Sequence, residues 1–365
     1  MNTGLDEREQ AVKGAMPAPP QPLPAASPSP CPTSTPLDAR TRSARSISAG
    51  APLGEARVIA VIPCYNRQVD LENVLGDLAR LEQTVTDDAA STTSLRIIVV
   101  DNCSQPALSL PSPSPGRALN ISLVRLETNT GGSGGYNAGM AAALDVFAGD
   151  PGPEPIRAGW PDPPAPTGVT LESPSDGDAT SLDLIWLIDS DARIGPRTLT
   201  PLIESLRCDP HAFIAGSAIA PAIGEPIFEL GGRINPRSGA FEPVARGVSG
   251  LDLPIRCQYV AACCALVRAD TVRSCGGFPD VFINGDDVLW CLRLSQRTGT
   301  HALAVPRSVA AHPTFDRVQT WTRYYTARNA FGPIDALGLT RSRRMMEGGV
   351  VRLRRATIET ARAVA

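Results

Sequence analysis

The chain has 365 residues, of which 42% are hydrophobic, and a formal net charge of -3 at neutral pH. This length can bury one large core or two smaller ones, so it is compatible with a globular enzyme. Proteins that bind nucleic acids usually carry a basic face, and we expect no nucleic-acid partner here. The sequence contains no apolar run of the roughly 18 to 20 residues that cross a bilayer, and no signal pattern at its start, so we expect a cytoplasmic protein.

Proline-rich stretches divide the chain. Residues 1–56 hold ten prolines among Ala, Ser and Thr, and residues 149–182 hold eight more. Such segments bury too little apolar surface to offset the entropy of ordering, so we predict a disordered leader and a disordered insertion. Residues 104–116 are predicted as a loop for the same reason. We expect one catalytic domain over 57–335 and a basic helical tail over 336–365.

Between these stretches, strand and helix patterns alternate. Apolar runs predict strands at 57–63, 96–102, 121–127 and 184–189, a helical period predicts a helix at 70–82, and another helix opens near Gly134. Strands that are apolar on both faces and alternate with helices indicate an α/β fold, in which a mostly parallel sheet is covered on both sides. Ligands of such sheets bind beyond the carboxyl ends of the strands.

The chain places polar residues at those ends. Asn66 and Arg67 follow the first strand, Asp101 ends the second, Asn129 follows the third, and Asp189 and Asp191 follow the fourth. Asp101 could accept hydrogen bonds from a nucleotide base or ribose, or could cap the next turn. The sequence alone leaves both open.

The glycine-rich run 129–139, NTGGSGGYNAG, precedes a helix. Exposed backbone amides at a helix start could bind phosphate, and the absence of side chains at residues such as Gly132 would let a ligand approach closely. The alternative is an ordinary flexible loop.

Two pairs of acids suggest catalysis. Asp189 and Asp191 lie one residue apart after a strand, so one could hold a ribose hydroxyl while the other binds a divalent cation; two solvated turn residues are the alternative. Asp286 and Asp287 open an amphipathic helix, where acids also cap the helix dipole. A partly buried pair could raise one pKa and let that carboxylate accept a proton from an acceptor hydroxyl.

Near the end of the predicted domain, His312 follows a strand-like segment and could reach a metal at the sheet edge. Trp321 and Tyr325 have helical spacing with Tyr324 and could stack on an acceptor sugar. A single histidine and aromatic residues at this spacing are also common in protein cores.

In order and spacing, these segments resemble the family 2 glycosyltransferases of the GT-A fold, and within them the branch that transfers galactofuranose or rhamnose. The resemblance covers about residues 57–332 through IPCYNR, VVDN, NTGGSGGYNAGM, LIDSDA, CGGFPDVFINGDDVLWCLR, HPTFDR and YYTARN. The insertion 149–182 is long for the family, and the Q-x-x-R-W motif of processive synthases is missing.

The resemblance implies an inverting, metal-dependent transfer of one sugar from a nucleotide diphosphate donor, in cell-wall or other glycan biosynthesis. It assigns Asp101 to the pyrimidine, Asp189 to the ribose, Asp191 and His312 to a divalent cation (Mn²⁺ or Mg²⁺), and Asp287, or else Asp286, to the acceptor proton. It also places Tyr65, Arg67, Asn129 and Gly132 around the nucleotide sugar, with Trp321 and Tyr325 near the acceptor.

Two other classes of function compete. A nucleotidyltransferase would need a glycine-rich basic loop directly after the first strand, where this chain has CYNRQ at 64–68. A catalytically inactive nucleotide-sugar-binding protein would be expected if a key acid or His312 were missing. The acceptor could be a glycan, a lipid-linked glycan or a small molecule. The tail 336–365 holds seven arginines. It could be a solvated helix packed loosely on the domain, or it could contact the inner face of a membrane peripherally.

Overall fold

The computed structural model describes residues 56–87, 93–110, 119–149, 182–235, 241–244, 251–313 and 320–329. All of them belong to one compact unit, Ala51–Ala365. The predicted leader, nearly all of the predicted insertion and the predicted basic tail lie outside the described residues.

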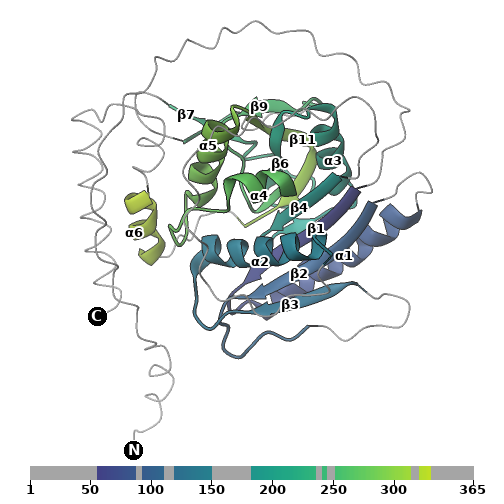
Figure 1. Ribbon diagram of the computed structural model, residues 1–365, viewed down its shortest axis with the longest axis vertical. Coiled ribbons are helices and arrows are strands. Elements are labelled where there is room, and N and C mark those ends of the chain that lie inside the picture. The colour runs from purple at the N-terminus through teal and green to yellow at the C-terminus, as the bar shows by residue number, and fades with distance from the viewer. Residues whose placement is uncertain are drawn as a thin grey trace, which may run out of the picture. The chain divides into compact units, whose positions relative to one another are not determined.

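The described part of the chain contains both strands and helices, which alternate in part (Figure 1). In order they are β1 Ala56–Cys64, α1 Gln68–Asp87, β2 Thr93–Asp101, β3 Ile121–Arg125, α2 Gly131–Phe147, β4 Leu182–Ile188, β5 Arg193–Ile194, α3 Leu199–Cys208, β6 Ala212–Ala220, β7 Gly232–Ile234, β8 Phe241–Pro243, β9 Ile255–Cys257, β10 Cys264–Arg268, α4 Ala269–Cys275, α5 Asp286–Thr298, β11 His301–Ala311 and α6 Thr320–Asn329.

Most of the strands form one mixed sheet with the order β3-β2-β1-β4-β10-β6-β11-β5. β3, β2, β1 and β4 are parallel to one another. β10 runs antiparallel to both β4 and β6, and β11 runs parallel to β6. β1, β4, β6 and β11 therefore all point the same way, and their carboxyl ends lie at one edge. This is the mixed, mostly parallel sheet that the sequence predicted.

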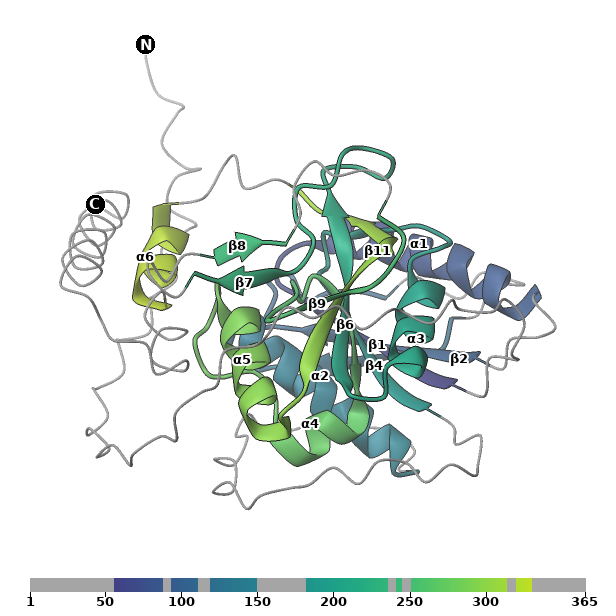
Figure 2. The same ribbon diagram turned by 90° about the horizontal axis from the view of Figure 1, so that it is seen from above.

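Helices cover both faces of the sheet (Figure 2). α1 packs on β2 and β5 and α3 on β6 and β11, whereas α2 packs on β1 and β2, α4 on β4 and β10, and α5 on β11. The side chains of β1 alternate between the two resulting cores: Ile59 and Val61 join one, and Val58, Ala60 and Ile62 join the other. This alternation explains why the strand reads as a continuous apolar run.

α2 begins at Gly131, three residues before the predicted start, so the glycine-rich run forms the first turns of a helix instead of a loop. Two of its glycines allow close packing on the sheet. A Cβ on Gly139 would lie 2.2 Å from Val61 Cγ1, and one on Gly135 would lie 2.8 Å from Pro63 Cβ. The flexible-loop alternative is therefore wrong, and helix–sheet packing accounts for part of the glycine content.

The eight cysteines of the described part are free thiols. Among the described residues, no helix has both the length and the apolar character needed to cross a membrane.

Candidate active site

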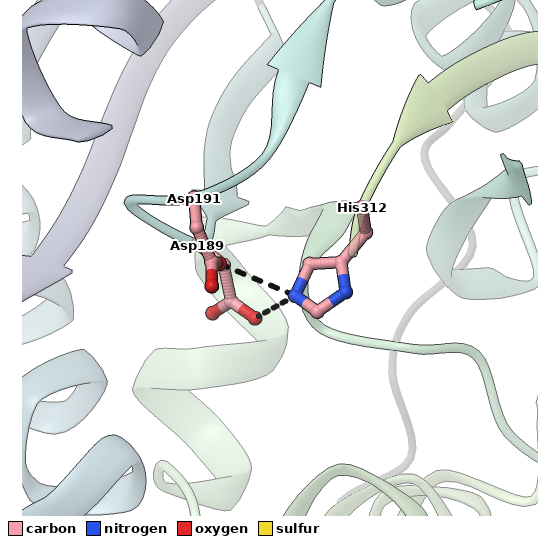
Figure 3. Close-up of side chains that lie close together, drawn as sticks. All are labelled: Asp189, Asp191 and His312. Carbon is pink, nitrogen blue, oxygen red and sulfur yellow. Dashed lines mark ion pairs between the residues drawn. The ribbon is translucent and has the colours of Figure 1, made fainter. Parts of the chain in front are cut away.

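The carboxyl edge of the sheet brings three predicted metal ligands together. Asp189 and Asp191 follow β4, and His312 follows β11. The ligand atoms of these three residues, here called the metal triad, all lie within 4.8 Å of one another. His312 Nε2 is 3.2 Å from Asp191 Oδ1 and 3.4 Å from Asp189 Oδ2, as Figure 3 shows. Strands that are distant in sequence thus supply a compact set of oxygen and nitrogen donors.

The imidazole of His312 is oriented by its neighbours. Its backbone N–H donates to Ala220 O at 3.0 Å. Its Nδ1 lies 3.0 Å from the carbonyl oxygen of Pro313, which can only accept, so Nδ1 carries a proton and Nε2 faces the two carboxylates. A histidine whose second nitrogen donates to a carbonyl is a common arrangement at metal sites.

Electrostatics match a cation at this position. Burial alone would lower the pKa of His312, but hydrogen bonds and charges from Asp189 and Asp191 raise it to about 10. Burial would raise the pKa of Asp191, yet His312 and Arg67 hold it below its ordinary value. Arg67 Nη1 lies 3.5 Å from Asp191 Oδ2 and 2.9 Å from Asp70 Oδ2. The two acids thus stabilise positive charge at this position, and Nε2 must release its proton when the imidazole binds a metal.

The donor set suits a divalent cation. Carboxylate oxygens are the usual ligands of Mg²⁺ and Mn²⁺, and an imidazole favours Mn²⁺ over Mg²⁺. The metal triad therefore has the residue types and the spacing that a cation requires.

A buried tyrosine holds one of these ligands. The Tyr136 hydroxyl, on α2, lies 2.6 Å from Asp189 Oδ1 and 3.2 Å from Ala262 O. The Tyr136 side chain is only 3% exposed, and burial and the charge of Asp189 raise its pKa well above the ordinary value. It therefore remains protonated and donates a hydrogen bond.

The second pair of acids starts α5. Asp286 Oδ2 accepts a hydrogen bond from Ser133 Oγ at 3.2 Å, and Asp287 Oδ2 accepts one from Ala262 N at 3.3 Å. Burial, followed by the charge of Asp287, raises the pKa of Asp286 to about 7. Burial, followed by the charge of Glu229, raises the pKa of Asp287 to about 7 as well. Either carboxylate can thus take up a proton near neutral pH.

Residue 262 connects the two groups of acids. Its carbonyl faces the Tyr136 hydroxyl that contacts Asp189, and its N–H donates to Asp287. The metal triad and the acid pair therefore belong to one site.

The Asp101 carboxylate accepts backbone hydrogen bonds from the turn that follows β2. The side chain is 2% exposed, and its two oxygens accept hydrogen bonds from Ser104 N at 2.8 Å and Leu108 N at 3.0 Å. These contacts are those of the turn-capping alternative. Contact of Asp101 with a nucleotide base stays a prediction.

Other predicted nucleotide-binding residues lie at the same edge. Asn129 Oδ1 accepts a hydrogen bond from Gly131 N at 2.9 Å, which shapes the start of α2. Gly132 lies beside the acid pair, since a Cβ there would be 3.7 Å from Asp286 Oδ2. The ring of Tyr65 is 46% exposed just after β1. Their roles toward a nucleotide sugar stay predictions.

The two predicted acceptor residues lie on α6. Tyr325 stacks on Phe282 with ring centroids 4.9 Å apart, and Arg328 lies 4.8 Å from the centroid of Tyr325. Packing therefore explains this tyrosine, and an acceptor role stays a prediction. The side chain of Trp321 lies outside the described part of the chain.

Sequence reasoning did not single out Tyr136, Asn102 or Ser133. Asn102 is buried, donates to Gly131 O at 2.8 Å and accepts from Thr130 N at 2.9 Å, so it ties β2 to the start of α2. The sequence offered one signal for Tyr136 and Asn102. A buried tyrosine or asparagine needs a hydrogen-bond partner, so either residue in a segment expected to pack on the sheet indicates such a contact.

Comparison with known protein families gives a match for one part of the chain. Residues 59–147, from β1 to the end of α2, match the model of glycosyl transferase family 2. No curated protein matches the chain.

Several solved structures are similar in part. GalNAc-T7 with UDP, GalNAc and Mn²⁺ is 12% identical, with 72% of this chain and 43% of that chain covered and a TM-score of 0.46. S. aureus TarS is 14% identical, with 84% and 73% covered and a TM-score of 0.40. The mannosyltransferase PcManGT from Pyrobaculum calidifontis, in complex with GDP-Man and Mn²⁺, is 15% identical, with 87% and 77% covered and a TM-score of 0.45. The chain thus spans less than half the length of GalNAc-T7.

Over residues 59–147, the chain is therefore similar to glycosyl transferase family 2.

Proposed function

We propose that this chain transfers one sugar from a nucleotide diphosphate donor to an acceptor hydroxyl, with a divalent cation and with inversion at the sugar carbon. The observation that carries the proposal is the connection of two acidic groups through Tyr136 and Ala262 at one sheet edge. The metal triad would bind a cation, and Asp286 and Asp287 would accept a proton.

The donor end of the site is the metal triad. Asp189, Asp191 and His312 would hold the cation, which when bound neutralises the charge that develops on the leaving diphosphate. Asp189 also has an oxygen directed at Tyr136, and we propose that this carboxylate lies next to the ribose. Arg67 contacts Asp191, and its guanidinium would add positive charge near the phosphates. We propose that Tyr65, Asp101, Asn129 and Gly132 complete the nucleotide-sugar site.

The acceptor end is the acid pair. Asp287 is our first choice for the general base and Asp286 the second, because backbone N–H groups of Ala262 and Val288 fix the Asp287 carboxylate. In a single displacement, the carboxylate takes the hydroxyl proton and the acceptor oxygen bonds to the anomeric carbon. The bond from that carbon to the diphosphate breaks, and the nucleoside diphosphate leaves with the electron pair. Attack on the face opposite the leaving group inverts the configuration.

For the donor we propose UDP-galactofuranose first and dTDP-rhamnose second, from the resemblance of the motifs. The proposed acceptor is a glycan, a lipid-linked glycan or a small molecule in cell-wall or other glycan biosynthesis. We also propose that the tail 336–365 contacts the inner face of the membrane peripherally.

A donor panel tests the function. The chain is incubated with UDP-galactofuranose, dTDP-rhamnose and common UDP- and GDP-sugars in the presence of Mn²⁺. Thermal stabilisation and nucleoside diphosphate release are then measured. We expect both effects with at least one donor. Stabilisation without release or transfer to any acceptor would indicate an inactive binding protein and contradict the proposal.

A further inference from the structure

The loop that delivers the acid pair has an unusual backbone. Phe282, Asn284 and Gly285 have φ angles of 69°, 67° and 77°, and Asp286 follows directly. Glycine adopts this left-handed region readily, but a bulky residue such as phenylalanine rarely does. Surrounding contacts must therefore hold residues 281–285, here called the entry loop, in this conformation.

Those contacts come from α6, more than thirty residues later in the sequence. Asn329 is 9% exposed, and its Nδ2 lies 2.8 Å from both Ile283 O and Asn284 O and 3.3 Å from Val281 O. One amide group thus contacts three carbonyls of the entry loop. Val281 O also accepts a hydrogen bond from Ile283 N at 2.9 Å. The amide therefore matters most for the carbonyls of Ile283 and Asn284, because the loop is neither helix nor strand.

Other side chains of α6 add to this contact. Asn284 Nδ2 donates to Thr326 Oγ1 at 3.0 Å, Arg328 donates to Val281 O, and the ring of Tyr325 stacks on Phe282. α6 therefore binds the entry loop through both polar and aromatic contacts.

On its other side, the entry loop lies against the start of α2. Ser133 N donates to Phe282 O at 3.4 Å, and a Cβ on Gly131 would be only 2.1 Å from that oxygen. Ser133 Oγ also donates to Asp286 Oδ2 at 3.2 Å. The position of the entry loop thus determines where the acid pair meets the glycine-rich start of α2.

We propose that Asn329 is a positioning residue: it holds the entry loop in its left-handed conformation, so that the acid pair stands correctly for proton transfer. Asn329 itself does not contact the reacting atoms in this account. The consequence for turnover rests on the proposed function, whereas the consequence for the loop does not.

The test compares full-length Asn329→Asp with the wild type. The substitution keeps the shape of the side chain but replaces the Nδ2 donor with an oxygen, which the carbonyls repel. We expect amide hydrogen exchange in 281–285 to accelerate by about tenfold or more while exchange in β1 stays unchanged. We also expect kcat to fall by about tenfold or more with the donor KM within about twofold.

Two further variants sharpen the result. Thr326→Val removes the hydroxyl that accepts from Asn284 Nδ2, and we expect the same changes at smaller size. This variant still tests the proposal if Asn329→Asp folds poorly. Thr298→Val removes a hydrogen bond to Leu294 O at the far end of α5 and serves as the matched control; we expect it to change neither loop exchange nor kcat.

Unchanged exchange in 281–285, or an equal increase throughout the chain, would overturn the proposal. So would equal effects of Asn329→Asp and Thr298→Val on kcat. Because the exchange measurement needs no substrate, it separates failure of this proposal from failure of the proposed function.

Discussion

The hydroxyl of Tyr136 lies 2.6 Å from Asp189 Oδ1, so a buried residue of α2 orients a carboxylate at the end of β4. Such partners commonly tune the affinity of a metal site without touching the metal. We therefore predict that Tyr136→Phe weakens Mn²⁺ binding by about tenfold, which calorimetric titration of the metal would detect.

The control for this variant is Tyr324→Phe, whose ring meets Tyr325 on α6. It should bind Mn²⁺ like the wild type. Equal metal affinity in all three proteins would mean that Tyr136 serves packing alone.

Substitutions of Asp286 and Asp287 should slow the chemical step without weakening donor binding. Asp287→Asn keeps the shape of the side chain but removes its basicity. We predict that donor affinity is retained while kcat falls by about a hundredfold or more, as measured by donor titration and steady-state kinetics. Asp286→Asn is the companion variant and should lower kcat less. If Asp287→Asn had near-normal turnover and Asp286→Asn had lost most of it, Asp286 would be the general base instead.

Turnover should depend on pH through the same residues. Burial raises the pKa of both Asp286 and Asp287 to about 7, and a base acts only when ionised. We therefore expect kcat to decline by up to about tenfold per pH unit below pH 7 and to level off above it. A profile that stays flat down to pH 5 would exclude a base of this kind.

Stability should change with pH in the opposite direction. The pKa of each carboxyl is 3.8 in its ordinary state and about 7 in the folded chain, so the folded chain binds more protons between these values. The contribution of the pair to the free energy of unfolding is then largest near pH 4 and declines as pH rises to about 7. Urea unfolding of Asp286→Asn at pH 5 and pH 8 should show a smaller decline than the wild type; an equal decline would assign it to other groups.

The glycines of α2 give a prediction for folding. A Cβ on Gly139 would lie 2.2 Å from Val61 Cγ1, so Gly139→Ala should lower the free energy of unfolding by about 1 to 3 kcal/mol. Gly76 in α1 is the matched control, since the nearest atom to its Cβ would be Arg80 Nη1 at 3.9 Å. Gly76→Ala should be neutral or stabilising by up to about 1 kcal/mol, because alanine favours a helix. Equal destabilisation by both substitutions in thermal melts would contradict the packing role.

Sequence patterns predicted β1, β2, β3 and β4 because both faces of the sheet are apolar, but they did not predict β6 and β10. They also predicted which residues follow β4 and β11, and the structure brings Asp189, Asp191 and His312 together because those strands share a carboxyl edge. The contact between Tyr136 and Asp189 was not predictable, since it depends on the close approach of α2 to the sheet. Nor could periodicity reveal that Asn329 reaches back 46 residues to Ile283.

For the glycine-rich run and for Asp101, the sequence alone left two interpretations open. From the sequence, the run 129–139 was compatible with a phosphate site or with a flexible loop. The 2.2 Å approach of a Gly139 Cβ to Val61 Cγ1 shows instead that helix packing requires Gly139. Asp101 was compatible with base recognition or with a turn, and its contacts with Ser104 N and Leu108 N are those of a turn.

Our central proposal is that the chain acts as a glycosyltransferase with a cation held by Asp189, Asp191 and His312. The most direct measurement is nucleoside diphosphate release from the donor that stabilises the chain, with Mn²⁺, with excess chelator, and in Asp191→Ala with Mn²⁺. We predict release only by the wild type with Mn²⁺, and a weaker, partial loss in His312→Ala because water can replace one ligand. Undiminished release in chelator, or by Asp191→Ala, would contradict the account.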